Sequence, residues 1–194
     1  MSEVFLFFVQ KKQKKCLLFL HDSYYKKAQI RLALKGKTMT NEMSTLNFDS
    51  IIPELKASNV KSVFQKLSTH VHRLIGTPER FILGHLLEQE KRENSGIGNG
   101  VAIAHMRLPR LTHPMIIYSK LSQSVDFNAN DGEPVDLLCL ILSPDHEGSV
   151  HLQRLAKVTR FFRDISFCDK LRTATDKDEI RQILKEINYH KLAA

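Results

Sequence analysis

Apolar residues follow two successive helical patterns downstream of residue 45. In the first, they recur three and four positions apart and share one face of a helix: Val60, Val63, Phe64, Leu67, Val71, Leu74 and Ile75. Ser58 or Asn59 is a candidate N-cap for this helix, and Gly76 is expected to end it. Thr77 and Pro78 then predict the start of a second helix, with Thr77 as the N-cap. Its expected apolar positions are Ile82, Leu83, Leu86 and Leu87.

Short apolar runs in the middle of the chain predict strands. Residues 101–104 (VAIA) follow a glycine-rich turn and lead directly to His105, at the expected end of the strand. Residues 115–118 (MIIY) predict a second strand, and residues 125–127 a short third one. The run at 135–142 (VDLLCLIL) is almost continuously apolar, which is typical of a strand buried on both faces.

Helical patterns return after the buried run. Ser149 is a candidate cap for a helix with apolar positions at Leu152, Leu155, Ala156, Phe161 and Phe162. A last helix is expected to begin at Asp176 and to bury the residues Ile180, Ile183, Leu184 and Ile187. Strands interleaved with helices, one strand being buried on both faces, predict an α/β layered domain. We expect this domain to span residues 45–190.

The charge distribution sets the N-terminus apart. The net charge is +8, but residues 1–38 hold nine Lys or Arg against two acidic residues, and the other 156 residues carry 20 basic and 19 acidic side chains. Residues 1–44 are therefore interpreted as a basic extension. It is open whether they form an amphipathic membrane-surface segment, a poorly packed appendage, or sequence upstream of a true start at Met39 or Met43. A nucleic-acid interaction would rest on these residues alone, so we expect none for the domain.

Composition narrows the class of protein. Hydrophobic residues make up 42% of the chain and charged residues 26%, which are ordinary values for a globular protein. The three cysteines are odd in number and form no CxxC pair, which favours a reducing compartment. No apolar run approaches the roughly 20 residues needed to span a bilayer. We expect a cytoplasmic protein without membrane insertion.

The candidate chemistry centres on the segment SGIGNGVAIAH, residues 95–105. Glycines at positions 96, 98 and 100 permit positive φ, and the strand behind them supports His105. His151 is expected in the first turn of its helix, where free N–H groups favour an anion. Two imidazoles flanking one anionic group, or two independent surface histidines, both fit this spacing. A neutral imidazole is a nucleophile toward phosphorus, and backbone N–H groups are suitable donors for phosphoryl oxygens.

The sequence contains none of the usual motifs for a nucleotide or a metal. No Walker A segment, metal-ligand cluster or G-x-S-x-G is present, so we expect no metal and no cofactor. If His105 accepts a phosphoryl group, the expected donor is a phosphoprotein.

The glycine segment with His105 resembles the active-site signature of the enzyme IIA proteins of the fructose/mannitol class. The variety it is most similar to is the nitrogen-regulatory enzyme IIA of the bacterial phosphotransferase system (PTS). The likeness runs in order from about residue 45 to 188. It continues through 134–138 (PVDLL), 143–144 (SP), His151-Leu152 with Leu155-Ala156, Asp164 and the helix containing 178–180.

The resemblance implies a fold in which a mixed β-sheet lies between helices, the PTS EIIA type-2 or phosphotransferase/anion-transport-like fold. His105 matches the histidine that accepts a phosphoryl group from an HPr-like histidine phosphocarrier, and His151 matches the supporting histidine. Such proteins act on regulatory targets, such as transporters or sensor kinases, by phosphorylation state. The expected role is therefore signal transduction through a phosphohistidine, as a phosphotransferase component and not as a stand-alone metabolic enzyme.

The phosphate-binding residues are predicted with less support from the resemblance. We expect Ser95 and the backbone of Gly98 and Gly100 to contribute. The arginine that holds phosphate in the family aligns with Gln89, and Arg92 is the candidate replacement. Ala104 stands where the family has proline, which leaves φ before His105 less restricted. These departures keep a second hypothesis open, a binding module that has lost efficient transfer.

Overall fold

The computed structural model describes residues 46–189. Its elements, in chain order, are β1 (Ser50–Leu55), α2 (Val60–Ile75), α3 (Glu79–Arg92), β2 (Gly96–Gly98), β3 (Val101–Leu108), β4 (Met115–Val125), β5 (Val135–Pro144), α4 (Gly148–Phe162), α5 (Ile165–Thr173) and α6 (Lys177–Tyr189). The basic extension predicted at residues 1–44, with its boundary at residue 45, lies outside the described residues. The hypotheses about membrane or nucleic-acid contact by that segment therefore stay predictions.

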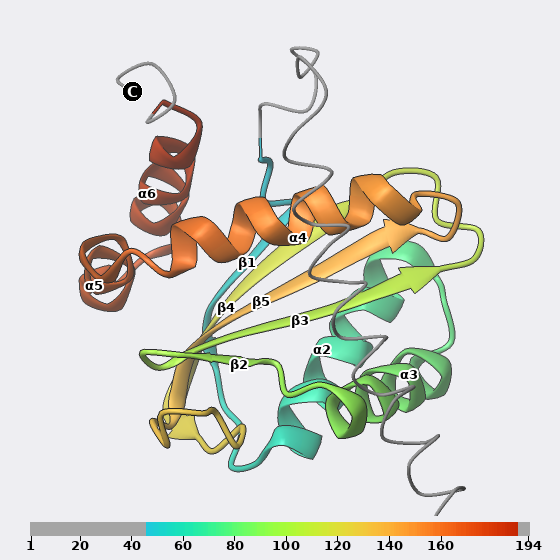
Figure 1. Ribbon diagram of the computed structural model, residues 1–194, viewed down its shortest axis with the longest axis horizontal. Coiled ribbons are helices and arrows are strands. Elements are labelled where there is room, and N and C mark those ends of the chain that lie inside the picture. Colours follow the sequence, from blue (N-terminus) through green and yellow to red (C-terminus); the bar gives the residue numbers. More distant parts are fainter. Residues whose placement is uncertain (1–45, 190–194) are drawn as a thin grey trace, which may run out of the picture. The chain divides into compact units, whose positions relative to one another are not determined.

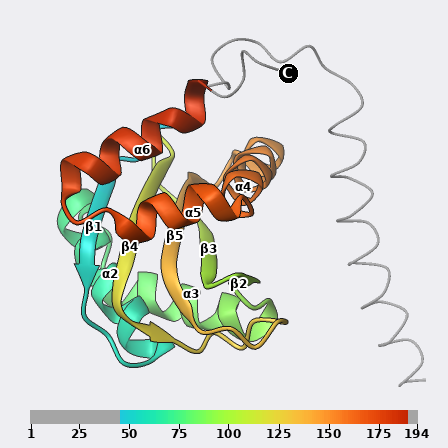
Figure 2. The same cartoon turned by 90° about the vertical axis from the view of Figure 1, so that its left-hand side faces the viewer.

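A five-stranded mixed sheet forms the centre of the domain, in the order β1-β4-β5-β3-β2. β1 pairs with β4, and β3 with β5, in parallel; β4 with β5, and β2 with β3, are antiparallel. Helices α2 and α3 cover one face of the sheet, and α4, α5 and α6 lie on the other (Figures 1 and 2). This architecture confirms the expected fold class, a mixed sheet between helices.

Two cores follow from the alternation of side chains along the strands. On β3, Ala102 and Ala104 contribute to the core beneath α2 and α3, whereas Val101 and Ile103 contribute to the core beneath the C-terminal helices. Every residue of β5 except Asp136 is buried, as the apolar run predicts for a central strand. The sheet therefore presents its odd-numbered β3 positions to the C-terminal helices.

Local capping explains where α2 begins and ends. Asn59 accepts a hydrogen bond from the backbone N–H of Ser62 at 2.9 Å, and the Ser62 side chain completes a capping box. Gly76 ends the helix with φ of 71°, in the left-handed region that glycine tolerates best. Both boundaries confirm the sequence prediction. Asp176 likewise accepts hydrogen bonds from the N–H groups of Asp178 and Glu179 at the start of α6.

Some boundaries differ from the prediction. Pro78, not Thr77, is the N-cap of α3, and it makes no side-chain capping bond. α4 begins at Gly148 with Glu147 at the N-cap, so the prediction that Ser149 caps this helix is wrong. β4 runs without a break to Val125, which replaces the two strands predicted there. β1 and α5 were not predicted at all.

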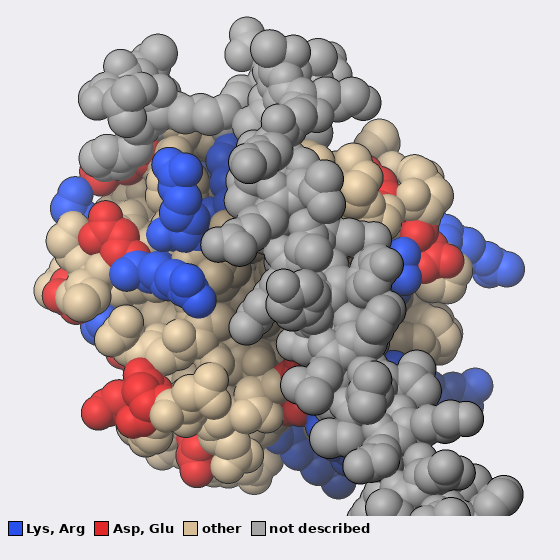
Figure 3. All heavy atoms as spheres, in the orientation of Figure 1, with Lys and Arg blue, Asp and Glu red and all other residues tan. Residues whose placement is uncertain are grey.

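The surface carries both signs of charge. On the face drawn in Figure 3, basic and acidic side chains lie near one another between broad uncharged areas. This agrees with the near balance of 20 basic and 19 acidic residues after residue 38.

Candidate active site

His105 lies within β3 and not at its end. The strand continues through Leu108 because β3 keeps its parallel register with β5 from Val101 opposite Leu137 to Leu108 opposite Pro144. The expectation that the strand ends at Ala104 is therefore wrong. His105 shares the face of Val101 and Ile103, the one covered by the C-terminal helices. The strand holds the half-buried imidazole at a fixed depth in the layer beneath α4.

His151 reaches the same point from α4. It lies in the first turn, as predicted, and its backbone N–H donates to the carbonyl of Glu147 at 2.9 Å. The imidazole is buried, with 5% of its surface exposed. Its Nε2 lies 3.1 Å from Nδ1 of His105, and the ring centroids are 5.1 Å apart. Of the two open interpretations, the structure thus supports the paired imidazoles.

The other ring nitrogen of His151 meets a polar group from the sheet. Nδ1 lies 2.8 Å from Oγ of Ser143, which is fully buried on β5. Nη1 of Arg154 donates to the same Oγ at 2.7 Å and to Oε2 of Glu147 at 3.0 Å. A continuous chain of contacts therefore runs from Glu147 through Arg154, Ser143 and His151 to His105.

Burial keeps the His151 ring uncharged. Its pKa is lowered to about 4, chiefly because the ring is removed from water, with further contributions from His105, Arg107 and Arg154. A neutral imidazole has one donor nitrogen and one acceptor nitrogen. At neutral pH His151 thus donates in one of its contacts with Ser143 and His105 and accepts in the other, and it carries no positive charge.

Gly98 and Gly100 precede the start of β3, whereas His105 lies in its middle. His105 is five positions after Gly100, and an extended strand covers about 16 Å over five residue steps. Both glycines have positive φ, 95° and 73°. The structure therefore does not bring these two predicted phosphate-binding residues together with His105, because β3 is straight and regular between them.

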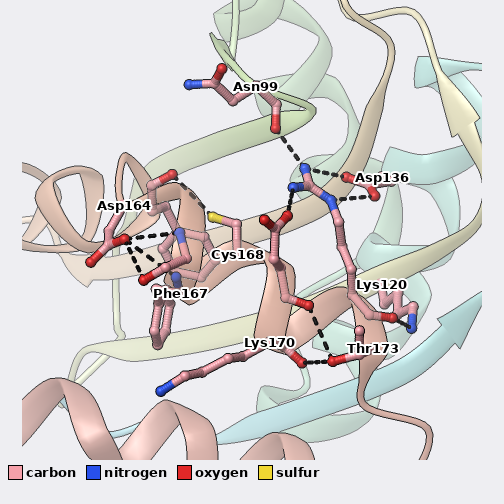
Figure 4. A network of polar contacts seen from close by, with 12 residues as sticks. Asn99, Lys120, Asp136, Asp164, Phe167, Cys168, Lys170 and Thr173 are labelled. Carbon is pink, nitrogen blue, oxygen red and sulfur yellow. Dashed lines mark hydrogen bonds and ion pairs between the residues drawn. The ribbon is translucent and has the colours of Figure 1, made fainter.

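The glycine turn is packed against a different polar cluster. Arg172 binds the Asp136 carboxylate with both Nε and Nη2, at 2.8 and 3.0 Å, and also donates to the carbonyl of Asn99 at 2.6 Å (Figure 4). A Cβ on Gly100 would lie 2.7 Å from Arg172 Nη2 and 2.8 Å from Asp136 Oδ1. Glycine is needed here so that the turn fits beneath the ion pair.

Ser95 lies closer to the pair than the glycines do. Its carbonyl accepts from the N–H of Ile103 at 2.8 Å, which sets it beside β3 two residues before His105. Its buried hydroxyl donates to Glu90, and its backbone N–H lies 3.2 Å from both oxygens of that carboxylate. Burial raises the pKa of Glu90, and the hydrogen bonds from Ser95 oppose this shift.

Arg92 has no described contact with the histidines. It is exposed and lies 3.5 Å from Oε2 of Glu88 on its own helix. Gln89, at the position where the family has arginine, donates to Glu93 at 3.5 Å. Both positions considered for the phosphate-binding arginine, Gln89 and Arg92, thus contact glutamates four residues away in sequence.

Sequence reasoning missed the residues behind His151. Ser143 was noted only as part of the resemblance, and Glu147 and Arg154 were not singled out. Two features of the sequence indicate that these residues lie near His151. Glu147, His151 and Arg154 are four and three residues apart, which places them on one helix face, and Ser143 shares the parity of the inward residues Leu137, Cys139 and Ile141.

Between residues 46 and 189, no group of three or more His, Cys, Asp or Glu side chains is arranged to hold a metal ion. Within the same range, no helix is both long and apolar enough to cross a bilayer.

Comparison with known proteins agrees with the fold and the sequence motif. Residues 44–187 match the model of the family described as phosphoenolpyruvate-dependent sugar phosphotransferase system, EIIA 2. A nitrogen regulatory protein of Bradyrhizobium diazoefficiens is 37% identical over 136 residues, which cover 70% of this chain and 89% of that protein. A nitrogen regulatory protein of Escherichia coli K12 is 29% identical over 155 residues, or 76% of this chain and 95% of the relative.

Solved structures extend the comparison to three dimensions. The crystal structure of nitrogen regulatory protein IIA-Ntr from Neisseria meningitidis superposes with a TM-score of 0.65 at 26% identity, covering 73% of this chain and 94% of that one. Enzyme IIA-mannitol of Escherichia coli, solved in complex with phosphorylated enzyme IIB-mannitol, has a TM-score of 0.58 at 18% identity, over 72% and 96% of the two chains, and shows the likeness of fold alone. Taken with the family match over residues 44–187, these comparisons show that the chain belongs to the EIIA type-2 family of the phosphotransferase system, and that its relatives include nitrogen regulatory proteins.

Proposed function

We propose that the protein is a phosphocarrier whose His105 accepts a phosphoryl group on Nε2 from the phosphohistidine of an HPr-like carrier protein. The observation that carries the proposal is the contact between His151 Nε2 and His105 Nδ1 at 3.1 Å. Because Nδ1 of His105 lies against Nε2 of the buried His151, we assign the attack on phosphorus to Nε2 of His105. Membership of the EIIA type-2 family supports the same assignment.

The transfer follows from the chemistry of two imidazoles. The lone pair on Nε2 of His105 attacks phosphorus, the new N–P bond forms, and the N–P bond to the donor histidine breaks. The electron pair of the broken N–P bond stays on the donor nitrogen, and the proton on Nδ1 of His105 stays hydrogen-bonded to His151. The positive charge that the attack places on the His105 ring is the charge that the protonated donor ring gives up, so none is created on His151. His151 thus acts by orienting His105 and by accepting its Nδ1–H.

The phosphorylated state is proposed to be the signal. The names of the relatives indicate nitrogen regulation, and we infer that the chain binds regulatory targets, such as transporters or sensor kinases, in one phosphorylation state. The proposed setting is the cytoplasm, where a phosphocarrier donor and such targets meet. Ser95 is proposed to contribute to the phosphate site, since it is bonded to β3 beside His105.

Intact mass spectrometry tests the transfer directly. The full chain is incubated with a phosphorylated HPr-type donor, and we expect the mass to increase by one phosphoryl group in an acid-labile, base-stable linkage. His105→Ala abolishes the increase, and His151→Ala slows it by roughly 100-fold, the loss typical of a positioned proton-handling group. His72→Gln, an exposed histidine on α2, leaves it unchanged. Phosphate that persists in His105→Ala would contradict the proposal.

A second candidate function is a binding module in which transfer is impaired. The observation that favours it is the position of Gln89, whose amide contacts Glu93, together with the exposed Arg92 paired to Glu88. Neither side chain supplies a guanidinium to the histidine pair. If this function is correct, target binding is the same for the wild type and His105→Ala, and Gln89→Arg increases phosphorylation at least tenfold. An unchanged rate in Gln89→Arg favours the phosphocarrier.

A further inference from the structure

We propose that Arg154 is a positioning residue for phosphoryl transfer, which holds Ser143 and through it the imidazole of His151 against His105. The inference rests on the proposed function, because a positioned His151 matters only if His105 is the phosphoryl acceptor. It concerns a residue on α4 that does not belong to the glycine segment or to the two histidines.

The contacts of Arg154 are few and specific. Its side chain is 13% exposed, and Nη1 donates both to Ser143 Oγ at 2.7 Å and to Glu147 Oε2 at 3.0 Å. Glu147 is itself only 20% exposed. An arginine drawn out of solvent into two hydrogen bonds is held far more rigidly than exposed Arg92 on α3, which is 70% exposed. It therefore fixes the position of the Ser143 hydroxyl.

Register brings the hydroxyl and the histidine to one place. Ser143 lies opposite Arg107 on the neighbouring strand, just as Ile141 lies opposite His105. The residues at 105, 107, 141 and 143 thus share the sheet face beneath α4. Oγ of Ser143 lies 2.8 Å from Nδ1 of His151, and Nδ1 of His105 lies 3.1 Å from Nε2 of His151.

Proton counting shows why this arrangement suits the transfer. Attack through Nε2 requires the neutral His105 ring to carry its proton on Nδ1, where it is donated to His151. His151 then accepts on Nε2 and carries its own proton on Nδ1, donated to Ser143. The hydroxyl oxygen of Ser143 has two lone pairs, so it accepts from both His151 and Arg154. Arginine is only a donor, so Arg154 cannot accept a proton from Ser143, and proton movement along these hydrogen bonds stops at the hydroxyl.

Charges around His151 add to the effect of burial on its pKa. His105 and Arg107 face it from β3, and Arg154 faces it from its own helix together with Glu147. Asp145, in the turn before α4, lies 4.0 Å from Nε of Arg107. Arg154 opposes a positive charge on the ring, whereas Glu147 favours one. Removing one or the other partner of the same ion pair is therefore expected to move the pKa of His151 in opposite directions.

The test combines a spectroscopic readout with a kinetic one on the full chain. Histidine-selective ¹⁵N NMR reports the tautomer and pKa of His151, and intact mass reports the initial rate of phosphorylation by the HPr-type donor. In Arg154→Met, we expect the pKa of His151 to rise, by less than burial lowers it, and the rate to fall about tenfold. In Glu147→Gln, the pKa does not rise. Arg160→Met removes the same charge from an exposed position on α4 and changes neither readout.

Two further variants test the charge and geometry of Arg154 and the role of the Ser143 hydroxyl. Arg154→Lys keeps a cationic donor and restores the low pKa of His151, with only part of the rate, because an ammonium lacks the geometry of the guanidinium. Ser143→Ala removes the intermediate hydroxyl with a minimal change of volume. It is expected to disturb the His151 tautomer even if Arg154→Met does not fold.

The two proposals fail in different ways. If wild type takes up phosphate and Arg154→Met shows the same His151 tautomer, pKa and rate, the role of Arg154 is overturned and the phosphocarrier function stands. If wild type takes up no phosphate, the proposed function and with it the role in transfer are both overturned, even where the NMR signature responds to Arg154. A response of pKa and rate together in Arg154→Met, absent from Arg160→Met, supports both.

Discussion

Nε2 of His151 lies 3.1 Å from Nδ1 of His105, although 46 residues separate the two in the chain. One imidazole is presented by the middle of a parallel strand and the other by the first turn of a helix packed on that strand. Strand and helix are both rigid supports, so the pair needs little reorganisation before it acts. In the proposed function, the buried His151 orients the pair and the half-buried His105 reacts.

The first prediction concerns pH and stability. The pKa of His151 is about 4 in the folded chain and near 6.5 when unfolded, so between these values the unfolded chain binds more protons. Stability is therefore full above about pH 6.5 and is lost as the pH falls toward 4, by up to about 3 kcal/mol. Urea unfolding between pH 4 and 7 measures this loss, and His151→Gln should flatten the curve.

His70 also contributes to the pH dependence and has to be separated from His151. Burial lowers its pKa as well, so it contributes a loss of the same sign. The difference between wild type and His151→Gln isolates the contribution of His151. Parallel curves for the two proteins would contradict a depressed pKa at that residue.

The second prediction concerns the glycine turn. Gly100→Ala places a Cβ 2.7 Å from Arg172 Nη2 at a φ of 73°, and we expect a loss of about 2–4 kcal/mol in the free energy of unfolding. Gly132 has the same φ of 73° with no atom within 4 Å of an added Cβ, so Gly132→Ala should cost only about 1 kcal/mol. Chemical denaturation of both variants separates crowding from backbone strain. Equal losses would show that the Arg172 ion pair does not press on the turn.

The third prediction concerns the carboxylate behind Ser95. Glu90 accepts hydrogen bonds from the hydroxyl and the backbone N–H of Ser95. Because Glu90 is partly exposed, we expect Glu90→Gln to lower the free energy of unfolding by about 1 kcal/mol. Glu88→Gln, on the same helix but exposed, should stay within about 0.5 kcal/mol of wild type. Thermal unfolding compares them. A larger effect at Glu88 would be inconsistent with a structural role for Glu90.

The fourth prediction concerns the start of α2. Asn59→Ala removes the side-chain acceptor for the Ser62 N–H, which is bonded at 2.9 Å, and is expected to cost about 1 kcal/mol. Asn59→Asp keeps an acceptor and should retain most of the stability. Denaturant midpoints of the two variants test the capping box, and an equal loss in both would argue against it.

Local chemistry made much of the fold predictable. Asn59 and Gly76 terminate α2 through short-range hydrogen bonds and backbone preference, so their roles can be recognised without any tertiary contact. The apolar run that became β5 was equally clear, because a strand covered on both faces has little place for polar residues. The resemblance to the EIIA type-2 family rested on such local motifs and was confirmed by the comparisons.

Two short elements, β1 and α5, were missed. β1 (Ser50–Leu55) is short, contains Pro53 and an irregular register, and is a strand because it pairs with β4 more than sixty residues later. α5 has only nine residues and a narrow apolar face. Its start depends on the side chain of Asp164, which accepts from the N–H groups of Ser166 and Phe167. Neither pattern is long enough to stand out by periodicity.

The sequence by itself determined the α/β class, the capped helices and His105 as the reactive candidate, because these depend on periodicity, short-range bonds and a contiguous motif. Only the tertiary structure decided which residues accompany that histidine. The extended course of β3 places His105 about 16 Å along the strand from Gly100, and Gly98 pairs with Val101 at the start of β3, although both glycines are neighbours of the histidine in the motif. The packing of α4 on the sheet brings His151, Ser143 and Arg154 into one chain of hydrogen bonds, because strand register and helix face, unlike sequence distance, determine which side chains meet.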